Sequence, residues 1–355
     1  MIIIVIHHSY NLFEKKRLFF PHGSIYVEFF FIISGFLMAL SASKKPRCDV
    51  EKLGTETVGV ILGKLKRLLP YYIFGWITML ISDIAYFGAD KVFTADHLLR
   101  VPFSLTLLHV SGIPMQDVVG TDWYLSAMFM AMAVLYPILR RWNDIFIKIA
   151  APLIAIAAYA FMINRDGYVV GFMEWYGVFC KGFFRGIAGI SLGCSAFAVS
   201  RWLRRQFMYK GVPLLLSFVS TGCMLCTAAL MYFEIRGVYQ GTVVLLFYIA
   251  VVIIASRTAS INAVFQNKFC VKLGKLSMAV YLTHISLTRW INLAVENSET
   301  LLNFRKSEPG PPVLTAVFVV LSLVFGMVCI AVTEPIEKKL KELLKNQKQK
   351  QLTSE

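Results

Sequence analysis

Two adjacent histidines near the start of the chain, His7 and His8, are the residues best suited to proton transfer. An imidazole titrates near neutral pH and can remove a proton from a hydroxyl group. Glu28 opens the next apolar run, and its carboxylate could orient the imidazole and stabilise its cation, as in a triad without a fixed nucleophile. We expect His8 as general base with Glu28 as its orienting partner. The alternative is an interfacial histidine beside a helix-capping Glu28, and that alternative explains His7 better.

A second group of ionisable residues lies inside later apolar runs. Such side chains are costly at membrane depth and usually mark a pathway or a reaction centre. Arg185 lies near the middle of its run, where it could be a partner for Glu28 or a site for an anionic group. Ser277, Tyr281 and His284 fall at i, i+4 and i+7, on one face of a helix. We expect Arg185, Tyr281 and His284 to line a substrate cavity.

Lys64 and Arg67 form a basic pair directly before another apolar run. Such a pair suits a phosphorylated cytosolic ligand, for example the nucleotide end of coenzyme A. Ordinary anchoring at the membrane surface explains the pair equally well. Cys223 and Cys226 form a C-x-x-C inside an apolar helix, without a second pair or a histidine. We read them as packing residues and expect no metal site and no bound cofactor.

The elements that position these residues are predicted to be membrane-spanning helices. Hydrophobic residues make up 57% of the 355 residues, charged residues 16%, and the mean hydropathy is +0.64. A span requires roughly 20 apolar helical residues. The sequence predicts an all-α, polytopic bundle with a truncated first helix near residues 1–10, through a late start codon or a missing segment. The nine full spans are expected at 24–43, 70–87, 121–139, 146–163, 174–199, 212–233, 241–256, 273–294 and 312–333.

The loops and the tail complete the predicted organisation. One integral domain is expected over 1–337, followed by a basic cytoplasmic tail over 338–355 that is first amphipathic and then disordered. The loop 88–120 contains an apolar stretch at 97–110, which predicts an interfacial or re-entrant helix. No repeat of 20–50 residues is visible, so an inverted-repeat transporter gains no support.

The net charge of +15 reports membrane topology rather than nucleic-acid binding. With the 44–69 loop placed inside, 24 of the 36 Lys and Arg residues fall in inside segments and 9 in outside segments. This bias follows the positive-inside rule and sets the orientation of the chain. The Lys-rich tail would also attract anionic membrane lipids.

Taken together, these segments resemble the acyltransferase-3 family of bacterial membrane O-acyltransferases. The resemblance rests on His8, the stretch V-E-F-F-F-I-I-S-G-F-L at 27–37, and the basic pair before Pro70. It continues through W-Y-L-S at 123–126, G-x-x-S-x-x-x-Y-L-x-H at 274–284 and T-E-P at 333–335. Glu28 stands where the family more often has Asp, and Lys64 stands for the first Arg of an R-x-x-R pair.

The resemblance implies transfer of an acyl group, usually acetyl, from cytosolic acyl-CoA to a hydroxyl of a glycan or lipid-linked sugar. It implies a catalytic first-helix histidine, in this chain His8, which acts as general base on the acceptor hydroxyl or briefly takes the acyl group itself. It also implies a donor-binding basic pair, in this chain Lys64 and Arg67. It also implies a multi-pass protein of the bacterial cytoplasmic membrane. A transporter of an anionic or acylated solute, with Arg185, Arg289 and His284 as binding groups, is the rival function. An inactive, truncated relative is a third possibility, and the sequence leaves the acceptor, the acyl chain and the oligomeric state open.

Overall fold

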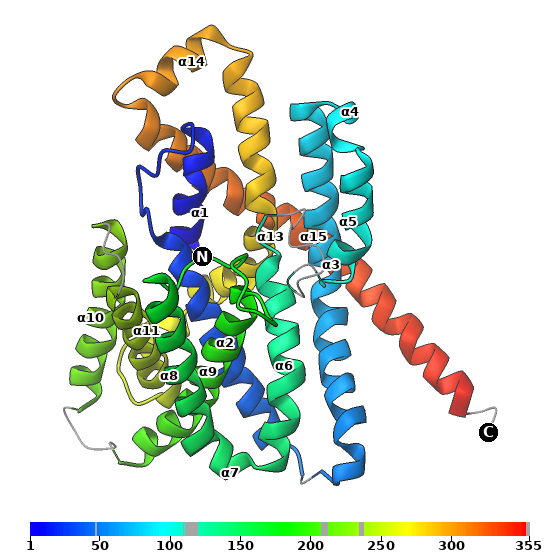
Figure 1. Cartoon of the computed structure of the whole chain (residues 1–355), viewed down its shortest axis with the longest axis vertical. Helices are drawn as coiled ribbons and strands as arrows, with labels where there is room; N and C mark the ends of the chain where they lie inside the picture. The colour runs from blue at the N-terminus through cyan, green and yellow to red at the C-terminus, as the bar shows by residue number, and fades with distance from the viewer. Residues whose placement is uncertain (47, 109, 111–119, 207–211, 234–237, 353–355) are drawn as a thin grey trace.

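The protein is a bundle of membrane-length helices (Figure 1). The computed structural model describes residues 1–46, 48–108, 110, 120–206, 212–233 and 238–352. Within these residues no strand forms, and the sole β-contact is an isolated bridge between Trp175 and Cys180. Eight helices in this part of the chain are long and apolar enough to cross a membrane. The predicted all-α, polytopic class is therefore confirmed.

The described residues form both long and short helices. In chain order, they are α1 (Ile2–His8), α2 (Tyr26–Ser43), α3 (Leu53–Phe87), α4 (Ala89–Val92), α5 (Ala95–Leu105), α6 (Trp123–Arg141), α7 (Asn143–Ile145), α8 (Ala151–Asp166), α9 (Lys181–Gln206), α10 (Val212–Tyr232), α11 (Val238–Ser256), α12 (Asn262–Phe265), α13 (Lys268–Glu296), α14 (Glu299–Lys306) and α15 (Gly310–Leu352). Short 3-10 turns η1 (Ser9–Leu12), η2 (Gly23–Ile25) and η3 (Val50–Lys52) precede or follow helices, and a π-helical turn η4 (Phe146–Ala150) leads into α8.

The predicted span 273–294 corresponds to helix α13, which is not among the eight apolar helices. At 29 residues it is about 43 Å long, which is enough to cross a bilayer. Its buried residues include Thr283, His284, Ser286, Thr288 and Asn292, so it lacks a continuous apolar window. Helix α13 packs mainly on α3 and α15, while His284 contacts His8 and Asn292 donates to the Asn11 carbonyl oxygen. Buried polar side chains on a helix of membrane-spanning length are expected of a functional element.

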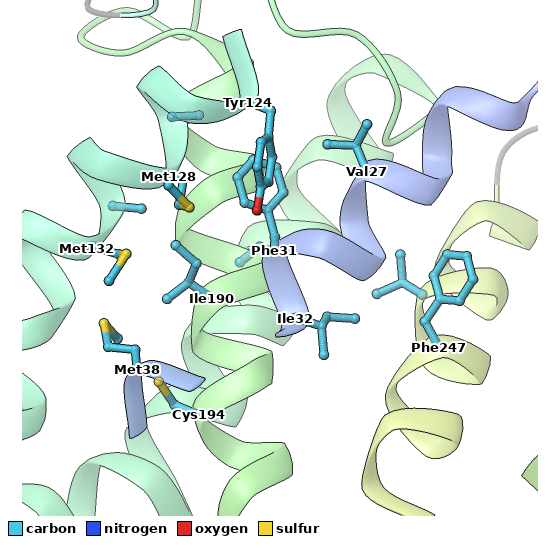
Figure 2. Close-up of a cluster of buried hydrophobic side chains, with 14 of the residues drawn as sticks. Val27, Phe31, Ile32, Met38, Tyr124, Met128, Met132, Ile190, Cys194 and Phe247 are labelled. Carbon is cyan, nitrogen blue, oxygen red and sulfur yellow. The ribbon is translucent and has the colours of Figure 1, made fainter. Parts of the chain in front are cut away.

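Helix α9 holds the centre of the bundle because glycines let its neighbours approach its backbone. A Cβ on Gly193 would lie 2.0 Å from the carbonyl oxygen of Ile32, and one on Gly35 2.0 Å from that of Ile190. Small residues at a helix interface allow this close packing within membranes. Around this seam lies the largest apolar core, where Phe31 contacts Tyr124 with ring centroids 4.7 Å apart (Figure 2).

The two ends of the bundle carry different features (Figure 1). Helices α4, α5 and α14 lie at one end, and α7 lies at the opposite end with the turn between α2 and α3. The helix expected at 97–110 is present as α5. The tail after residue 337 was predicted to be first amphipathic and then disordered, whereas the structure is helical through it as far as Leu352. Helix α15 continues to Leu352 and projects away from the bundle (Figure 1), because the Lys-rich segment keeps strong helix-forming residues without a breaker.

Candidate functional site

His8 and His284 meet at the centre of the candidate site, although 276 positions separate them in sequence. His8 ends helix α1, and His284 lies midway along α13. The Nε2 of His284 is 3.1 Å from the Nδ1 of His8, and the two ring centroids are 5.0 Å apart. His284 is fully buried, whereas His8 is partly exposed. The structure therefore joins two of the predicted site residues, with only His8 open to a reactant.

The hydrogen bonds fix which ring nitrogens carry protons when both histidines are neutral. The Nδ1 of His284 lies 3.0 Å from the carbonyl oxygen of Val280 and 2.9 Å from that of Tyr281, so it must donate its N–H to them. The Nε2 of His284 is then an acceptor, and the Nδ1–H of His8 donates to it and to the Ile4 carbonyl oxygen at 3.0 Å. The Nε2 of His8 is left with a free lone pair. This is the tautomer that a general base requires.

Apolar packing on α1, α13 and α15 holds this histidine pair in place. Val5 and Leu12 belong to a separate core cluster with Val280 of α13 and Phe318 of α15. All four are buried. The cluster pins α1 against α13, so a short helix is sufficient to present His8 at a fixed position.

His7 faces a different environment from His8. Its side chain is buried, and its Nδ1 donates to the carbonyl oxygen of Phe20 at 2.8 Å. A Cβ added at Gly23 would lie 2.6 Å from the Cβ of His7, so the turn before α2 packs directly on this residue. The structure gives His7 a local bond to the 9–25 segment and gives His8 the bond to His284.

Tyr281 lies beside the pair but uses its hydroxyl for a structural contact. The hydroxyl donates to the carbonyl oxygen of Thr121 at 2.8 Å, and the Thr121 hydroxyl donates back to the Tyr281 carbonyl oxygen at 3.1 Å. These two bonds tie α13 to the start of α6. The Tyr281 and His284 ring centroids are 6.1 Å apart. Tyr281 thus contributes a buried aromatic wall next to His284.

The predicted contact between Glu28 and His8 is not the one that the structure forms. The carboxylate of Glu28 accepts from the Arg185 Nε at 2.6 Å and from the Tyr159 hydroxyl at 2.5 Å. The side chains of Glu28 and Arg185 are at most 1% exposed to solvent. The carboxylate faces α9 and α8 because α2 packs its buried face on α9. Of the two roles open to Arg185, partner for Glu28 is therefore the one observed, and His284 makes the contact expected from Glu28.

Arg185 is held by more than this ion pair. Its Nη1 donates to the Gly171 carbonyl oxygen at 2.7 Å, and its guanidinium lies 4.6 Å from the ring centroid of Trp123. Its Nη2 is buried without a hydrogen-bond partner in the described part of the chain. Tyr159, the other partner of Glu28, was not among the residues predicted from the sequence. The available signal was that Tyr159 is the one tyrosine in the apolar run 146–163.

Lys64 and Arg67 lie on α3 away from the histidine pair. Lys64 is half-buried with its Nζ 3.6 Å from the Met132 sulfur, and Arg67 is exposed. Gly75 of the same helix packs on the Leu282 carbonyl, next to His284. Eleven residues separate Lys64 from Gly75, so the basic pair lies about 16 Å along α3 from that level. In the described residues no three His, Cys, Asp or Glu side chains gather as a metal site.

Sequence reasoning assigned no chemistry to Ser34, and the structure explains its place in the matched stretch. Its hydroxyl is 2.9 Å from that of Tyr124, which itself donates to the Phe30 carbonyl oxygen at 3.2 Å. The stretch at 27–37 and the W-Y-L-S stretch at 123–126 therefore interlock across α2 and α6. These motifs build the scaffold that holds the site.

The chain combines a polytopic helical fold with a buried histidine pair, and the sequence model of the acyltransferase-3 family, an acyltransferase domain, matches residues 1–332. The protein belongs to this family and is a multi-pass membrane acyltransferase. No curated protein and no solved structure matches the chain.

Proposed function

We propose that the protein transfers an acyl group, most simply acetyl, from cytosolic acyl-CoA to a hydroxyl of a cell-envelope glycan or lipid-linked sugar. The proposed location is the bacterial cytoplasmic membrane. The observation that carries the proposal is the tautomer of the His8–His284 pair. It leaves the Nε2 of a partly exposed His8 as a free proton acceptor inside an acyltransferase domain.

The proposed reaction needs one base and no covalent enzyme intermediate. The acceptor hydroxyl gives its proton to the Nε2 of His8 while its oxygen attacks the thioester carbonyl carbon. Collapse of the tetrahedral intermediate breaks the carbon–sulfur bond. The departing sulfur takes the proton back from Nε2 and leaves as the thiol of coenzyme A. His8 ends the cycle neutral, so the step balances without a metal or a redox partner.

His284 serves in this scheme as a positioning residue. It accepts the Nδ1–H of His8 and keeps the reactive nitrogen pointed away from α13. In a catalytic triad a carboxylate orients the histidine base; in this protein the neutral imidazole of His284 has that role. Tyr281 closes the wall beside it. Glu28 and Arg185 support the site through the packing of α2 on α9 rather than through His8.

The donor is proposed to approach from the end of the bundle that the positive-inside rule places in the cytosol. Lys64 and Arg67 would contact its phosphates, and the acyl arm would extend along α3 toward His284. Replacing Lys64 by Gln should raise the KM for acyl-CoA several-fold and leave kcat unchanged, because the contact is remote from the reacting atoms. A fall in kcat with an unchanged KM would contradict this role.

The test of the function is transfer of a labelled acyl group by the purified full chain in lipid vesicles. With radiolabelled acetyl-CoA and envelope glycan from a deletion strain as acceptor, label should appear covalently on the glycan. The His8→Ala variant should lose about 10²- to 10⁴-fold in rate, the usual contribution of a general base. Circular dichroism and gel filtration should show that the variant folds. Wild-type transfer by His8→Ala would overturn the assignment.

Transport is the rival function, and an assay in the same lipid vesicles distinguishes it from acyl transfer. A transporter would move labelled solute across the membrane without acyl-CoA and without covalent label on the glycan. Arg289, which was a candidate solute-binding group, is paired with Asp83 at 2.9 Å. That pairing reduces its availability for an anion and favours the enzyme.

A further inference from the structure

A pocket with a volume of about 650 Å³ lies beside helix α7, whose three residues are part of its lining. It is lined by the end of α2, the end of α6 with the turn that follows it, and Arg201 of α9. A second pocket of about 320 Å³ shares Lys45, Cys48 and Arg140 with it. All of these segments fall in loops that the positive-inside rule places in the cytosol. None of these pocket residues takes part in the histidine site.

One wall of the pocket is a fixed network of paired charges. Glu56 of α3 accepts from the Lys45 Nζ at 3.0 Å and from the Tyr136 hydroxyl at 2.6 Å. Arg140 contacts the same carboxylate at 3.0 Å, and its Nη2 donates to the Pro46 carbonyl oxygen at 2.6 Å. The Arg140 side chain is only 7% exposed. This network fixes the segment after α2, so the pocket has a preformed wall.

Other lining residues are cations without a carboxylate partner in the described part of the chain. Arg141 and Arg201 line the pocket and are exposed, and within the described residues neither forms an ion pair. The one acidic lining residue, Asp144, is held by Lys148 at 2.6 Å. Trp142, which follows Arg141 in the chain, also lines the pocket and is 56% exposed. Two guanidinium groups and an open indole thus face the same space.

From this arrangement we propose that the pocket is a binding site for a phosphate-bearing ligand. The guanidinium forks of Arg141 and Arg201 bind the phosphate oxygens, since arginine matches phosphate geometry with two parallel hydrogen bonds. Trp142 provides a flat face for a base or for the glycerol region of a headgroup. The phosphate comes either from a soluble nucleotide or from an anionic lipid. This site stands apart from the acyl-transfer step and is tested by binding alone.

The direct test uses adenosine 3′,5′-bisphosphate as the nucleotide probe and adenosine as its phosphate-free control. All titrations use the full chain with Lys64→Gln and Arg67→Gln, so that the proposed donor pair does not contribute to the signal. Isothermal titration in a neutral detergent should show binding of the bisphosphate and not of adenosine. The double variant Arg141→Gln/Arg201→Gln should weaken that binding at least tenfold. Arg205→Gln removes one exposed cation near the end of α9 but outside the pocket lining, and it should bind as wild type.

The source of the phosphate is decided by two further measurements. If the ligand is a nucleotide, Trp142→Leu should weaken binding of the bisphosphate by removing the face for its base. If the ligand is a lipid, the bisphosphate should not bind. Phosphatidylglycerol added to neutral vesicles should then raise the melting temperature of wild type and Arg205→Gln but not of the double arginine variant. Either pattern supports the site.

Cys48 gives an independent reporter because its thiol lines the pocket. The neighbouring Glu56 carboxylate raises the pKa of this thiol above its usual value, so alkylation should be followed near pH 8.5. Bound ligand should slow site-resolved alkylation of Cys48 in wild type and not in the double variant. The inference is overturned if neither probe binds, or if the double variant binds and protects Cys48 as wild type does. His8→Ala should retain binding, so failure of the acyl-transfer proposal would leave this result unchanged.

Discussion

The Glu28–Arg185–Tyr159 cluster and the His8–His284 pair both place ionisable side chains inside the bundle, but they differ in the bonding capacity that they leave free. In the Glu28–Arg185–Tyr159 cluster, both carboxylate oxygens accept hydrogen bonds, and the ion pair is almost completely buried. In the His8–His284 cluster, the contact is neutral, one partner is partly exposed, and one ring nitrogen keeps a free lone pair. In the first cluster both oxygens of the carboxylate are occupied and the whole ion pair is shielded from solvent. In the second, a ring nitrogen of the partly exposed His8 is left for a reactant.

The difference shows that burial of an ionisable group does not by itself identify a reaction centre. A charge buried at membrane depth must be paired, and pairing uses up its bonding capacity. Chemistry needs a group that the fold orients but leaves unsatisfied. The predictions that follow test this division between a cluster that holds the fold and a cluster that reacts.

The largest effect is expected from breaking the ion pair. Glu28→Gln or Arg185→Met alone should destabilise the protein by about 3–5 kcal/mol, because each leaves one buried partner unpaired. The double variant should recover much of that loss, since no uncompensated charge remains and the glutamine still accepts from Tyr159. The measurement is the unfolding temperature of each purified variant in the same detergent.

Asp83→Asn offers a matched control for this experiment. Asp83 pairs with Arg289, but the two side chains are 14% and 22% exposed, so solvent screens the pair and a smaller loss is expected. If Glu28 instead served His8 directly, Glu28→Gln would lower kcat with little change in stability. That result would place Glu28 in the reacting cluster with His8 and would contradict the division between a structural and a reacting cluster.

The second prediction concerns the orienting histidine. His284→Leu should lower kcat by about 10- to 100-fold, the usual range for a residue that positions a reactive group. The fold should persist because leucine suits this buried position. His284→Gln should restore part of the rate, since its side-chain oxygen can accept the Nδ1–H of His8. Equal rates for the leucine and glutamine variants would show that the hydrogen bond is not what matters.

Much of the fold was predictable because span length and apolar composition are local properties. Helix α13 departs from the continuous apolar composition of the other spans because several of its buried residues are polar. It packs on α3 and α15, and the local sequence does not indicate that packing. The end of α15 was also misjudged, since a charged segment without proline or glycine favours a helix as well as disorder.

The residues of the two clusters were easier to predict than the contacts that they make with one another. His8, Glu28, Arg185 and His284 each stand out as ionisable groups in apolar runs. Proximity in sequence favoured a pairing of Glu28 with His8, yet the observed pairs span 157 and 276 positions. Such pairings depend on which helices pack together, and in this bundle the glycines of α9 draw α2 toward Arg185. Which helices pack together depends on the whole bundle, so the partner of each residue cannot be found from the local sequence around it.

The smallest effect, and the finest test of the division, comes from the neighbouring histidine. His7→Leu removes the hydrogen bond to the Phe20 carbonyl and should cost about 1 kcal/mol of stability. Its rate per folded molecule should match wild type, because the ring of His7 bonds the 9–25 segment rather than His284. Activity normalised to the gel-filtration peak, measured beside His8→Leu, separates the two adjacent residues. A loss of rate in His7→Leu with His8→Leu active would transfer the base to His7. The free lone pair of His8 would then have no part in the reaction.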